Sequence, residues 1–332
     1  MSEPAAGGAD LQRRALLAEL ARAYYLDDVS KVDIAKAFGM SRFQVARLLD
    51  QARASGVVTI EVHDPRLPRS ARERALADAL GIDAARIVEL DESDGDLRVE
   101  QFGAVVLTAM RDAIRPGMTV GLSWSRTLDR AARFLPALPP CSLVQLTGAF
   151  EVAGSGTFGR MLMQLDRRAG IQTFPLYAPL VVDQRSTAED LRRQPVVADA
   201  LAHAEALDLA VVAIGAWLPG ESAVWENVPP DVRKACTRAG AVAEFSGTFL
   251  DAGGAVVPTP LDGRVIAVGL PQLRAARHVI GFAHGPRRAA ALRAAAASGA
   301  FTSMIVDSTL ASAVLRNSPF QEAPASAAAP PT

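Results

Sequence analysis

The spacing of hydrophobic positions changes along the chain after Pro65 and Pro68. Before that point, apolar side chains recur every three or four residues, as on one face of an α-helix. After it, short runs of continuously apolar residues alternate with helix-like segments. The sequence therefore predicts a helical N-terminal part followed by a larger part that mixes helices with strands.

Three helices are predicted in the N-terminal part. The first covers residues 11–25, and the small and polar residues 1–10 before it are expected to be disordered. Two shorter helices follow within residues 29–56. Gly39 between them can adopt a positive φ, and Ser41 is a candidate N-cap of the second. The apolar faces consist, in order, of Leu16, Leu17, Leu20 and Tyr24; Ile34, Ala35 and Phe38; and Val45, Leu48, Leu49 and Ala52. This arrangement is typical of a helix-turn-helix.

The polar face of the last of these helices carries the chemistry of a DNA reader. Arg42 and Arg47 can bond guanine through two hydrogen bonds, and Gln44 can do the same to adenine in the major groove. An ordinary αα-hairpin with exposed Arg and Gln would show the same pattern, and residues 1–63 carry eight basic and eight acidic side chains. The residues predicted to contact double-stranded DNA are Lys31, Ser41, Arg42, Phe43, Gln44 and Arg47.

Residues 57–65 alternate apolar and polar side chains and predict a short strand. Pro65 and Pro68 end it and indicate a domain boundary. We therefore expect a DNA-binding domain over residues 1–63, an effector domain over 64–315 and a disordered, Ala- and Pro-rich tail over 316–332.

The larger part is expected to be a doubly wound α/β domain of the Rossmann-like type. Its apolar runs are continuous instead of alternating, which indicates strands buried on both faces of a parallel sheet. The predicted strands or apolar segments cover residues 85–90, 118–122, 142–148, 207–217, 256–270, 278–285 and 301–306. The predicted helices cover residues 70–80, 99–114, 127–134 and 287–298.

Composition narrows the class of protein. Half of the 332 residues are hydrophobic, 21% are charged and the formal net charge is −1, which excludes a globally basic nucleic-acid binder. Only Cys141 and Cys236 are present, and the four histidines are scattered, so neither a disulfide framework nor a metal site is expected. The sequence shows no membrane span, signal peptide or cofactor motif, and we expect a cytoplasmic protein without a cofactor.

Ligands of doubly wound sheets bind beyond the carboxyl ends of the strands. Four loops there offer suitable groups: 121–127 with its hydroxyls, 145–149, 284–288 and the residue Asp307. The predicted contacts are Ser123, Trp124, Ser125, Arg126, Thr127, Gln145, Thr147, Gly148, His284, Arg288 and Asp307. Jointly these groups suit a polyhydroxylated, anionic small molecule.

Each loop also has a structural interpretation. A Ser or Thr of the first loop would cap a helix while Trp124 packs in the core, and Asp307 would cap the helix that follows it. Arg287 or Arg288 would be a solvated surface cation. His284 could act as a general acid or base, but no Ser or Cys partner stands at a recognisable spacing from any histidine.

The two parts together resemble the SorC (sorbitol-operon-regulator-like) family of bacterial transcription regulators over residues 11–315. The N-terminal signature is AYYLDDVSKVDIAKAFGMSRFQVARLLDQARASGVVTIEV. Further signatures are GLSWSRTL, VQLTGAF, TFPLYAPL, AVVAIGAW, AGAVAEFSGTFLDAGG and the run from GRVIAVGL to LASAVL. The resemblance implies a sugar-isomerase-like domain that has lost catalysis and binds a sugar, polyol or sugar phosphate, in a dimer or tetramer that binds operator DNA.

The resemblance also implies roles for particular residues. A phosphate would lie against Ser123, Ser125, Arg126 and Thr127, with Arg288 as the basic partner. Thr147, Gly148, Glu244 and Asp307 would face the sugar. This chain departs from the family pattern at Ser125, Ala149, 243–245, His284, Arg288 and Ser308. These departures predict an effector that differs from the common family sugars in size or in lacking phosphate.

Two other functions are compatible with the sequence. An active sugar-phosphate isomerase with a fused helix-turn-helix would need a general base, for which Glu244, Asp307 and His284 are the candidates. A helix-turn-helix used only for protein contacts would show no salt-dependent affinity for DNA.

Overall fold

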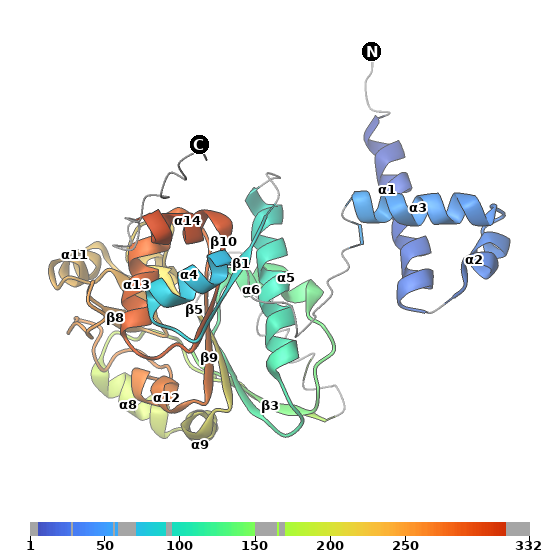
Figure 1. Cartoon of the computed structure of the whole chain (residues 1–332). Helices are drawn as coiled ribbons and strands as arrows, with labels where there is room; N and C mark the ends of the chain where they lie inside the picture. Colours follow the sequence, from blue (N-terminus) through green and yellow to red (C-terminus); the bar gives the residue numbers. More distant parts are fainter. Residues whose placement is uncertain are drawn as a thin grey trace, which may run out of the picture. The chain divides into compact units, whose positions relative to one another are not determined.

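The computed structural model describes residues 6–27, 29–55, 57–58, 71–90, 95–149, 165 and 170–316. The chain divides into two compact units, Met1–Pro68 and Arg69–Thr332 (Figure 1). Each unit has its own hydrophobic cluster and is described by itself. The boundary predicted at Pro65 and Pro68 lies outside the described residues and stays a prediction.

The N-terminal unit contains three helices, α1 (Ala6–Tyr25), α2 (Lys31–Ala37) and α3 (Arg42–Ala54). Ser30 caps α2 by accepting a hydrogen bond from the Asp33 amide, and Gly39 takes a φ of 64° in the turn. Ser41 and Gln44 form a capping box at the start of α3, which satisfies two amides that no helix hydrogen bond reaches. The three helices bury one shared apolar cluster. The predicted helix-turn-helix is confirmed.

Two predictions for this unit need qualification. Of residues 1–10, predicted to be disordered, residues 6–10 lie within α1, because an existing helix gains one hydrogen bond for each residue added. Residues 1–5 lie outside the described residues. Of the strand predicted over 57–65, only Val57 and Val58 are described, and both lie in a bend against the helical cluster. The tail after Arg316 lies outside the described residues.

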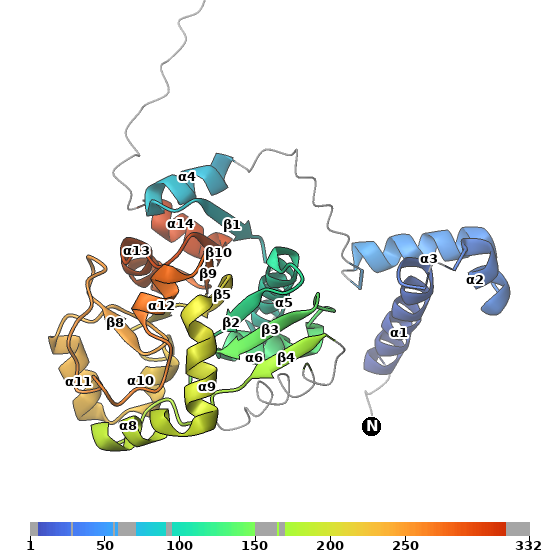
Figure 2. The same ribbon diagram turned by 90° about the horizontal axis from the view of Figure 1, so that it is seen from below.

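The second unit is built on a parallel sheet of seven strands in the order β1-β10-β9-β5-β2-β3-β4 (Figure 2). The strands are β1 (Ala84–Val88), β2 (Thr119–Leu122), β3 (Cys141–Gln145), β4 (Ile171–Phe174), β5 (Leu209–Ala213), β9 (His278–Ala283) and β10 (Ser303–Asp307). The edge strand β4 was not predicted, because its two adjacent polar residues Gln172 and Thr173 interrupt the apolar run.

Helices cover both faces of this sheet, and consecutive strand residues enter opposite clusters. Val211 packs with α5 (Gly95–Ala113) and α6 (Arg126–Ala131), whereas Val212 packs with the helices of the other face. Those helices include α4 (Ala71–Leu80), α9 (Pro195–His203), α12 (Leu270–Ala275), α13 (Ala289–Ala297) and α14 (Ser308–Arg316). The predicted doubly wound α/β fold is confirmed, and its apolar runs are continuous because both faces are buried.

A small antiparallel sheet, which was not predicted, adjoins the large one. It consists of β6 (Gly215–Ala216), β7 (Ala243–Phe245) and β8 (Thr248–Leu250). The run predicted as one strand over 207–217 is thus divided between β5 and β6. The apolar segment 256–270 forms isolated bridges instead of a strand. The remaining helices are α8 (Arg185–Arg193), α10 (Ala223–Asn227), α11 (Pro230–Arg238) and the short 3₁₀ turns Ala132–Phe134, Ala204–Ala206 and Pro286–Arg288.

Within the described residues, no helix is both long and apolar enough to cross a lipid bilayer.

Candidate functional site

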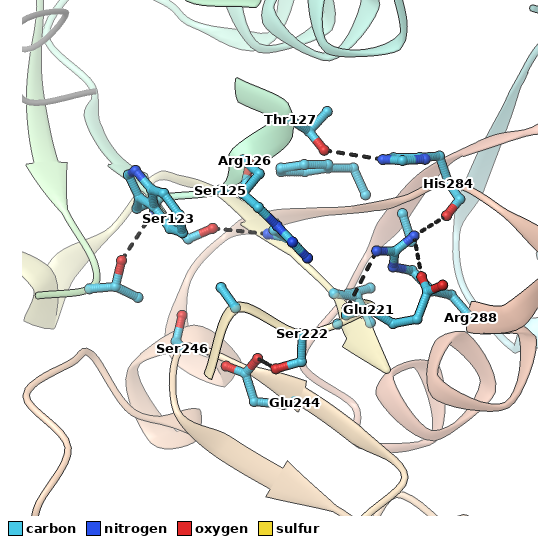
Figure 3. A pocket seen from close by; sticks show the side chains of 18 of the residues that line it. Ser123, Ser125, Arg126, Thr127, Glu221, Ser222, Glu244, Ser246, His284 and Arg288 are labelled. Carbon is cyan, nitrogen blue, oxygen red and sulfur yellow. Dashed lines mark hydrogen bonds and ion pairs between the residues drawn. The ribbon is translucent and has the colours of Figure 1, made fainter. Parts of the chain in front are cut away.

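A pocket opens beyond the carboxyl ends of β2, β5 and β9, and Figure 3 shows the side chains that line it. It contains about 640 Å³ of empty space, including the part that is open to solvent. Nine of the twelve predicted effector contacts line it: Ser123, Trp124, Ser125, Arg126, Thr127, Thr147, Glu244, His284 and Arg288. Loops that are far apart in the sequence therefore converge where strand order places them, as expected for a doubly wound sheet.

The hydroxyls of the 121–127 loop are held in place by backbone amides. Ser123 Oγ accepts a hydrogen bond of 2.9 Å from the Ala213 amide, and Ser125 Oγ accepts one of 3.0 Å from the Leu128 amide. Ser125 is thus the N-cap of α6, as the structural interpretation of this loop requires. Because a hydroxyl that accepts still has a proton to donate, both side chains keep a donor for a ligand.

Arginine side chains surround one side of the pocket. Arg288 is nearly buried and forms an ion pair with Glu221, with Nη1 and Oε2 2.9 Å apart. Arg287 pairs with the other carboxylate oxygen of Glu221 at 3.0 Å. Arg126 donates to the carbonyl oxygen of Gly220 at 2.8 Å. Figure 3 shows Glu221 beside Arg288, with dashed lines joining them, and the Arg126 side chain extending towards the same part of the pocket.

His284 is a neutral member of the lining. Burial lowers the pKa of its imidazole to about 4, and the nearby Arg288 guanidinium acts in the same direction. Its Nε2 atom lies 3.3 Å from Thr127 Oγ1. The imidazole therefore offers hydrogen bonds near neutral pH and adds no positive charge to the site.

The opposite side of the pocket carries the Glu244 carboxyl and the Ser222 and Ser246 hydroxyls. Burial raises the pKa of the Glu244 carboxyl, although hydrogen bonds from the Gly247 amide and the Ser222 hydroxyl lower it in part. Ser246 follows at a φ of 48°, and its buried Oγ has no hydrogen-bond partner in the described part of the chain. Ser246 and Gly247 both have positive φ, as the two central residues of a type I′ hairpin turn require.

Three predicted contacts lie behind the pocket wall. Gln145 donates to the carbonyl oxygen of Thr147 and accepts from the Leu176 amide. Gly148 packs directly against the backbone of residues 178–180. Asp307 accepts hydrogen bonds from the Gly285 and Leu310 amides and from the Thr309 hydroxyl, so it holds the 284–288 loop to the start of α14. Through these contacts, Gln145, Gly148 and Asp307 hold the segments that carry the pocket-lining residues in place.

Sequence reasoning missed three polar lining residues, Glu221, Ser222 and Ser246. All three come from the segments around the small sheet, which no apolar period predicted. The only local signal was the Ser-Gly pair at 246–247, which favours a tight turn.

The predicted DNA contacts lie at the start of α2 and along α3. Arg42, Phe43 and Arg47 are exposed, and Phe43 is 87% exposed, so packing within the unit does not use its ring. Ser41 and Gln44 are joined in the capping box, with Gln44 Oε1 accepting from the Ser41 amide at 2.8 Å. Lys31 lies over the Tyr24 ring at 4.9 Å.

Among the described residues, no group of three or more His, Cys, Asp or Glu side chains is placed to hold a metal ion. Both cysteines are buried and free, and burial raises the pKa of each thiol.

Comparison of the sequence and the fold with known proteins identifies the family of this chain. The family model described as a sugar-binding domain (Sugar-bind) matches residues 67–316. The transcriptional regulator LsrR of Klebsiella pneumoniae is 28% identical over 320 residues, covering 93% of this chain and 95% of LsrR. The deoxyribonucleoside regulator of Bacillus subtilis is 26% identical, covering 93% and 99%.

A solved structure has the same fold. The full-length sorbitol operon regulator SorC from Klebsiella pneumoniae superposes with a TM-score of 0.66 at 19% identity, covering 92% of this chain and 99% of SorC. The chain therefore belongs to the SorC-like family of transcriptional regulators that carry a sugar-binding domain.

Proposed function

We propose that this protein is a DNA-binding transcriptional regulator of a carbohydrate-metabolism operon, controlled by a sugar, polyol or sugar-phosphate effector. The helix-turn-helix would read the operator, and the pocket of the second unit would bind the effector without turnover. The relatives named above, LsrR and the deoxyribonucleoside regulator, support the regulatory role. The proposal includes a cytoplasmic location and self-association as a dimer or tetramer.

The observation that carries the effector role is the unpartnered hydroxyl of Ser246. A buried polar atom without a hydrogen bond costs free energy, so such atoms usually have a partner. Ser246 lines a pocket whose other polar groups include Ser222, Glu244 and the loop hydroxyls. A hydroxylated ligand would supply the missing hydrogen bond, and it could use the remaining donors at the same time.

The proposed mechanism is linkage between the two kinds of site. An effector that binds one arrangement of the oligomer more tightly shifts the population toward it. Only an arrangement that holds paired recognition helices about 34 Å apart, or at a multiple of that distance, engages both half-sites of an operator. The direction of regulation depends on which arrangement the effector favours.

The proposal is tested by fluorescence anisotropy with DNA from immediately upstream of the gene and with a scrambled control. Each DNA is titrated with and without a panel of sugars, polyols and their phosphates. Specific binding that one compound shifts is the expected result. Equal, weak binding to both DNAs under every condition would contradict it. Turnover of a sugar phosphate would instead favour the isomerase, with Glu244 or His284 as the base.

Replacing Phe43 by alanine is expected to weaken operator binding without destabilising the N-terminal unit. The ring is 87% exposed, so its loss removes no buried contact, whereas an exposed aromatic side chain at the start of a recognition helix can contact a thymine methyl group. We expect a loss of about 1–3 kcal/mol in specific binding. Anisotropy and a thermal melt measure the two effects. Leu26→Ala, which removes another exposed apolar side chain of this unit, is the control; equal affinities of the two variants would contradict the prediction.

Replacing Ser246 by glycine is expected to raise stability and lower effector affinity. Glycine adopts a φ of 48° without the strain that a side chain suffers there, and an unpaired buried hydroxyl is lost, so unfolding should cost about 1 kcal/mol more. Loss of one ligand hydrogen bond should weaken binding by about 1 kcal/mol. Ser246→Ala is the matched variant, because it keeps the strained φ and loses the same hydroxyl. Unchanged ligand affinity in both variants would argue against Ser246 as a contact.

A further inference from the structure

Glu221 occupies a position at the pocket that no sequence motif indicated. It lies between β6 and α10, and its side chain is 14% exposed. One carboxylate oxygen pairs with Arg288 at 2.9 Å and the other with Arg287 at 3.0 Å. Its backbone oxygen also accepts from Arg288 Nη2 at 3.4 Å. One carboxylate is thus shared by two arginines, of which Arg288 lines the pocket and is 13% exposed.

The neighbouring contacts hold this carboxylate in place. Arg126 donates to the carbonyl oxygen of Gly220, the residue before Glu221, and the Gly220 amide donates to Glu226. Ser222, the residue after it, bonds the buried Glu244 carboxyl at 3.1 Å. Residues 220–222 are therefore fixed on both sides of Glu221. Moving the carboxylate away from Arg288 would break its ion pairs with Arg287 and Arg288.

The Glu221 carboxylate lowers the positive charge that Arg287 and Arg288 present to a ligand. Arg288 Nη1, besides Glu221, contacts the backbone oxygen of His284. His284 is neutral near pH 7, because burial lowers its pKa to about 4. Among the described residues, Arg126 is the pocket cation that has no carboxylate within ion-pair distance. A phosphate dianion beside Arg288 would lie next to the Glu221 carboxylate, and like charges in a half-enclosed site repel strongly.

We propose that Glu221 is a specificity-determining residue that makes the pocket select an uncharged polyol or sugar over its phosphate ester. The inference rests on the proposed effector role of the pocket. Glu221 supplies the negative charge that Arg288 would otherwise take from a ligand, and the hydroxyl-rich wall around Ser222 and Ser246 supplies hydrogen bonds to an uncharged ligand.

The test measures ligand binding to the full-length protein without DNA, by calorimetry and thermal shift. The probes are inorganic phosphate and matched pairs of polyols or sugars with their phosphate esters. Three proteins are compared: the wild type, Glu221→Gln and Glu189→Gln. Glu189 lies exposed on α8, so the control removes the same charge away from the pocket. Glu221→Asp is a second variant that keeps a carboxylate if Glu221→Gln fails to fold.

The wild type and Glu189→Gln are expected to bind each unphosphorylated compound at least as tightly as its ester. Glu221→Gln should bind inorganic phosphate and the esters at least about tenfold more tightly than the wild type does, because a like charge is gone and Arg288 is free. Glu221→Asp should keep the wild-type preference. Tighter ester binding by the wild type, or no gain in phosphate affinity in Glu221→Gln, would overturn the inference.

This outcome is separable from the proposed function. If Glu221→Gln gains phosphate affinity while no compound shifts operator binding, the regulatory role fails and the role of Glu221 stands. If a phosphate ester shifts operator binding of the wild type more strongly than its unphosphorylated form, the regulatory role stands and the role of Glu221 fails.

Discussion

Replacing Leu49 by alanine is expected to abolish operator binding while effector binding by the second unit stays unchanged. Leu49 lies on α3, is 2% exposed and packs in the cluster that joins the three helices of the N-terminal unit. Truncating a buried leucine to alanine costs about 2–5 kcal/mol, because apolar contact is lost and a cavity remains. A unit as small as Met1–Pro68 has little stability to spare. The recognition helix should therefore lose its fixed orientation.

The experiment compares Leu49→Ala with Leu26→Ala in the full-length protein. Leu26 is 74% exposed, so the same change there removes almost no buried surface. Anisotropy measures operator affinity, amide hydrogen exchange reports the stability of α1 to α3, and thermal shift with the effector reports the second unit. If the two variants bind DNA equally well, the cluster does not support recognition. If Leu49→Ala also loses effector binding, the two units do not fold separately.

Replacing Gly148 by alanine is expected to destabilise the second unit and to weaken effector binding together. A Cβ atom at this position would lie 2.7 Å from the Ala178 carbonyl oxygen, and at the same distance from backbone atoms of Pro179 and Leu180. Backbone atoms cannot rotate away as the end of a side chain can, so the two segments must separate. We expect a cost of about 1–3 kcal/mol, as for other overpacked sites.

The effect on the ligand follows from the neighbouring residue. Thr147 lines the pocket and accepts a hydrogen bond from the Trp124 amide at 3.1 Å, which ties two pocket loops together. A shift at Gly148 should move Thr147 and lower effector affinity, although Gly148 itself does not line the pocket. Chemical denaturation and calorimetry measure the two effects. Gly95→Ala is the control, because a Cβ there has no atom within 4 Å. A Gly148→Ala variant as stable as this control would contradict the predicted close approach.

The helix-turn-helix was predictable because its signals are local. Apolar spacing defines the buried faces of α2 and α3, and the Ser41–Gln44 capping box lies within four consecutive residues. The strands of the large sheet were predictable for a similar reason. Residues such as Val211 and Val212 are both buried, on opposite faces, so the run contains no polar interruption.

Prediction was weaker where a local pattern has two structural outcomes. The apolar run continues from Leu209 to Trp217 without a polar side chain, yet the chain leaves the large sheet after Ala213 and enters the small one at Gly215. Asp307 follows a strand and could face a ligand or cap a helix. In the structure it accepts three hydrogen bonds that join the 284–288 loop to α14. Only the positions of those partners distinguish the two roles.

The sequence by itself determined the helix-turn-helix, the α/β pattern that follows it and the strand ends from which the loops leave the sheet, because periodicity, caps and turns act between residues a few positions apart. Only the tertiary structure decided how the pocket is charged. Glu221 and Arg288 are 67 residues apart, and Ser246 comes from a hairpin without an apolar period. Their contacts arise when the sheet brings separate loops together, and the electrostatics of the site depends on those distances.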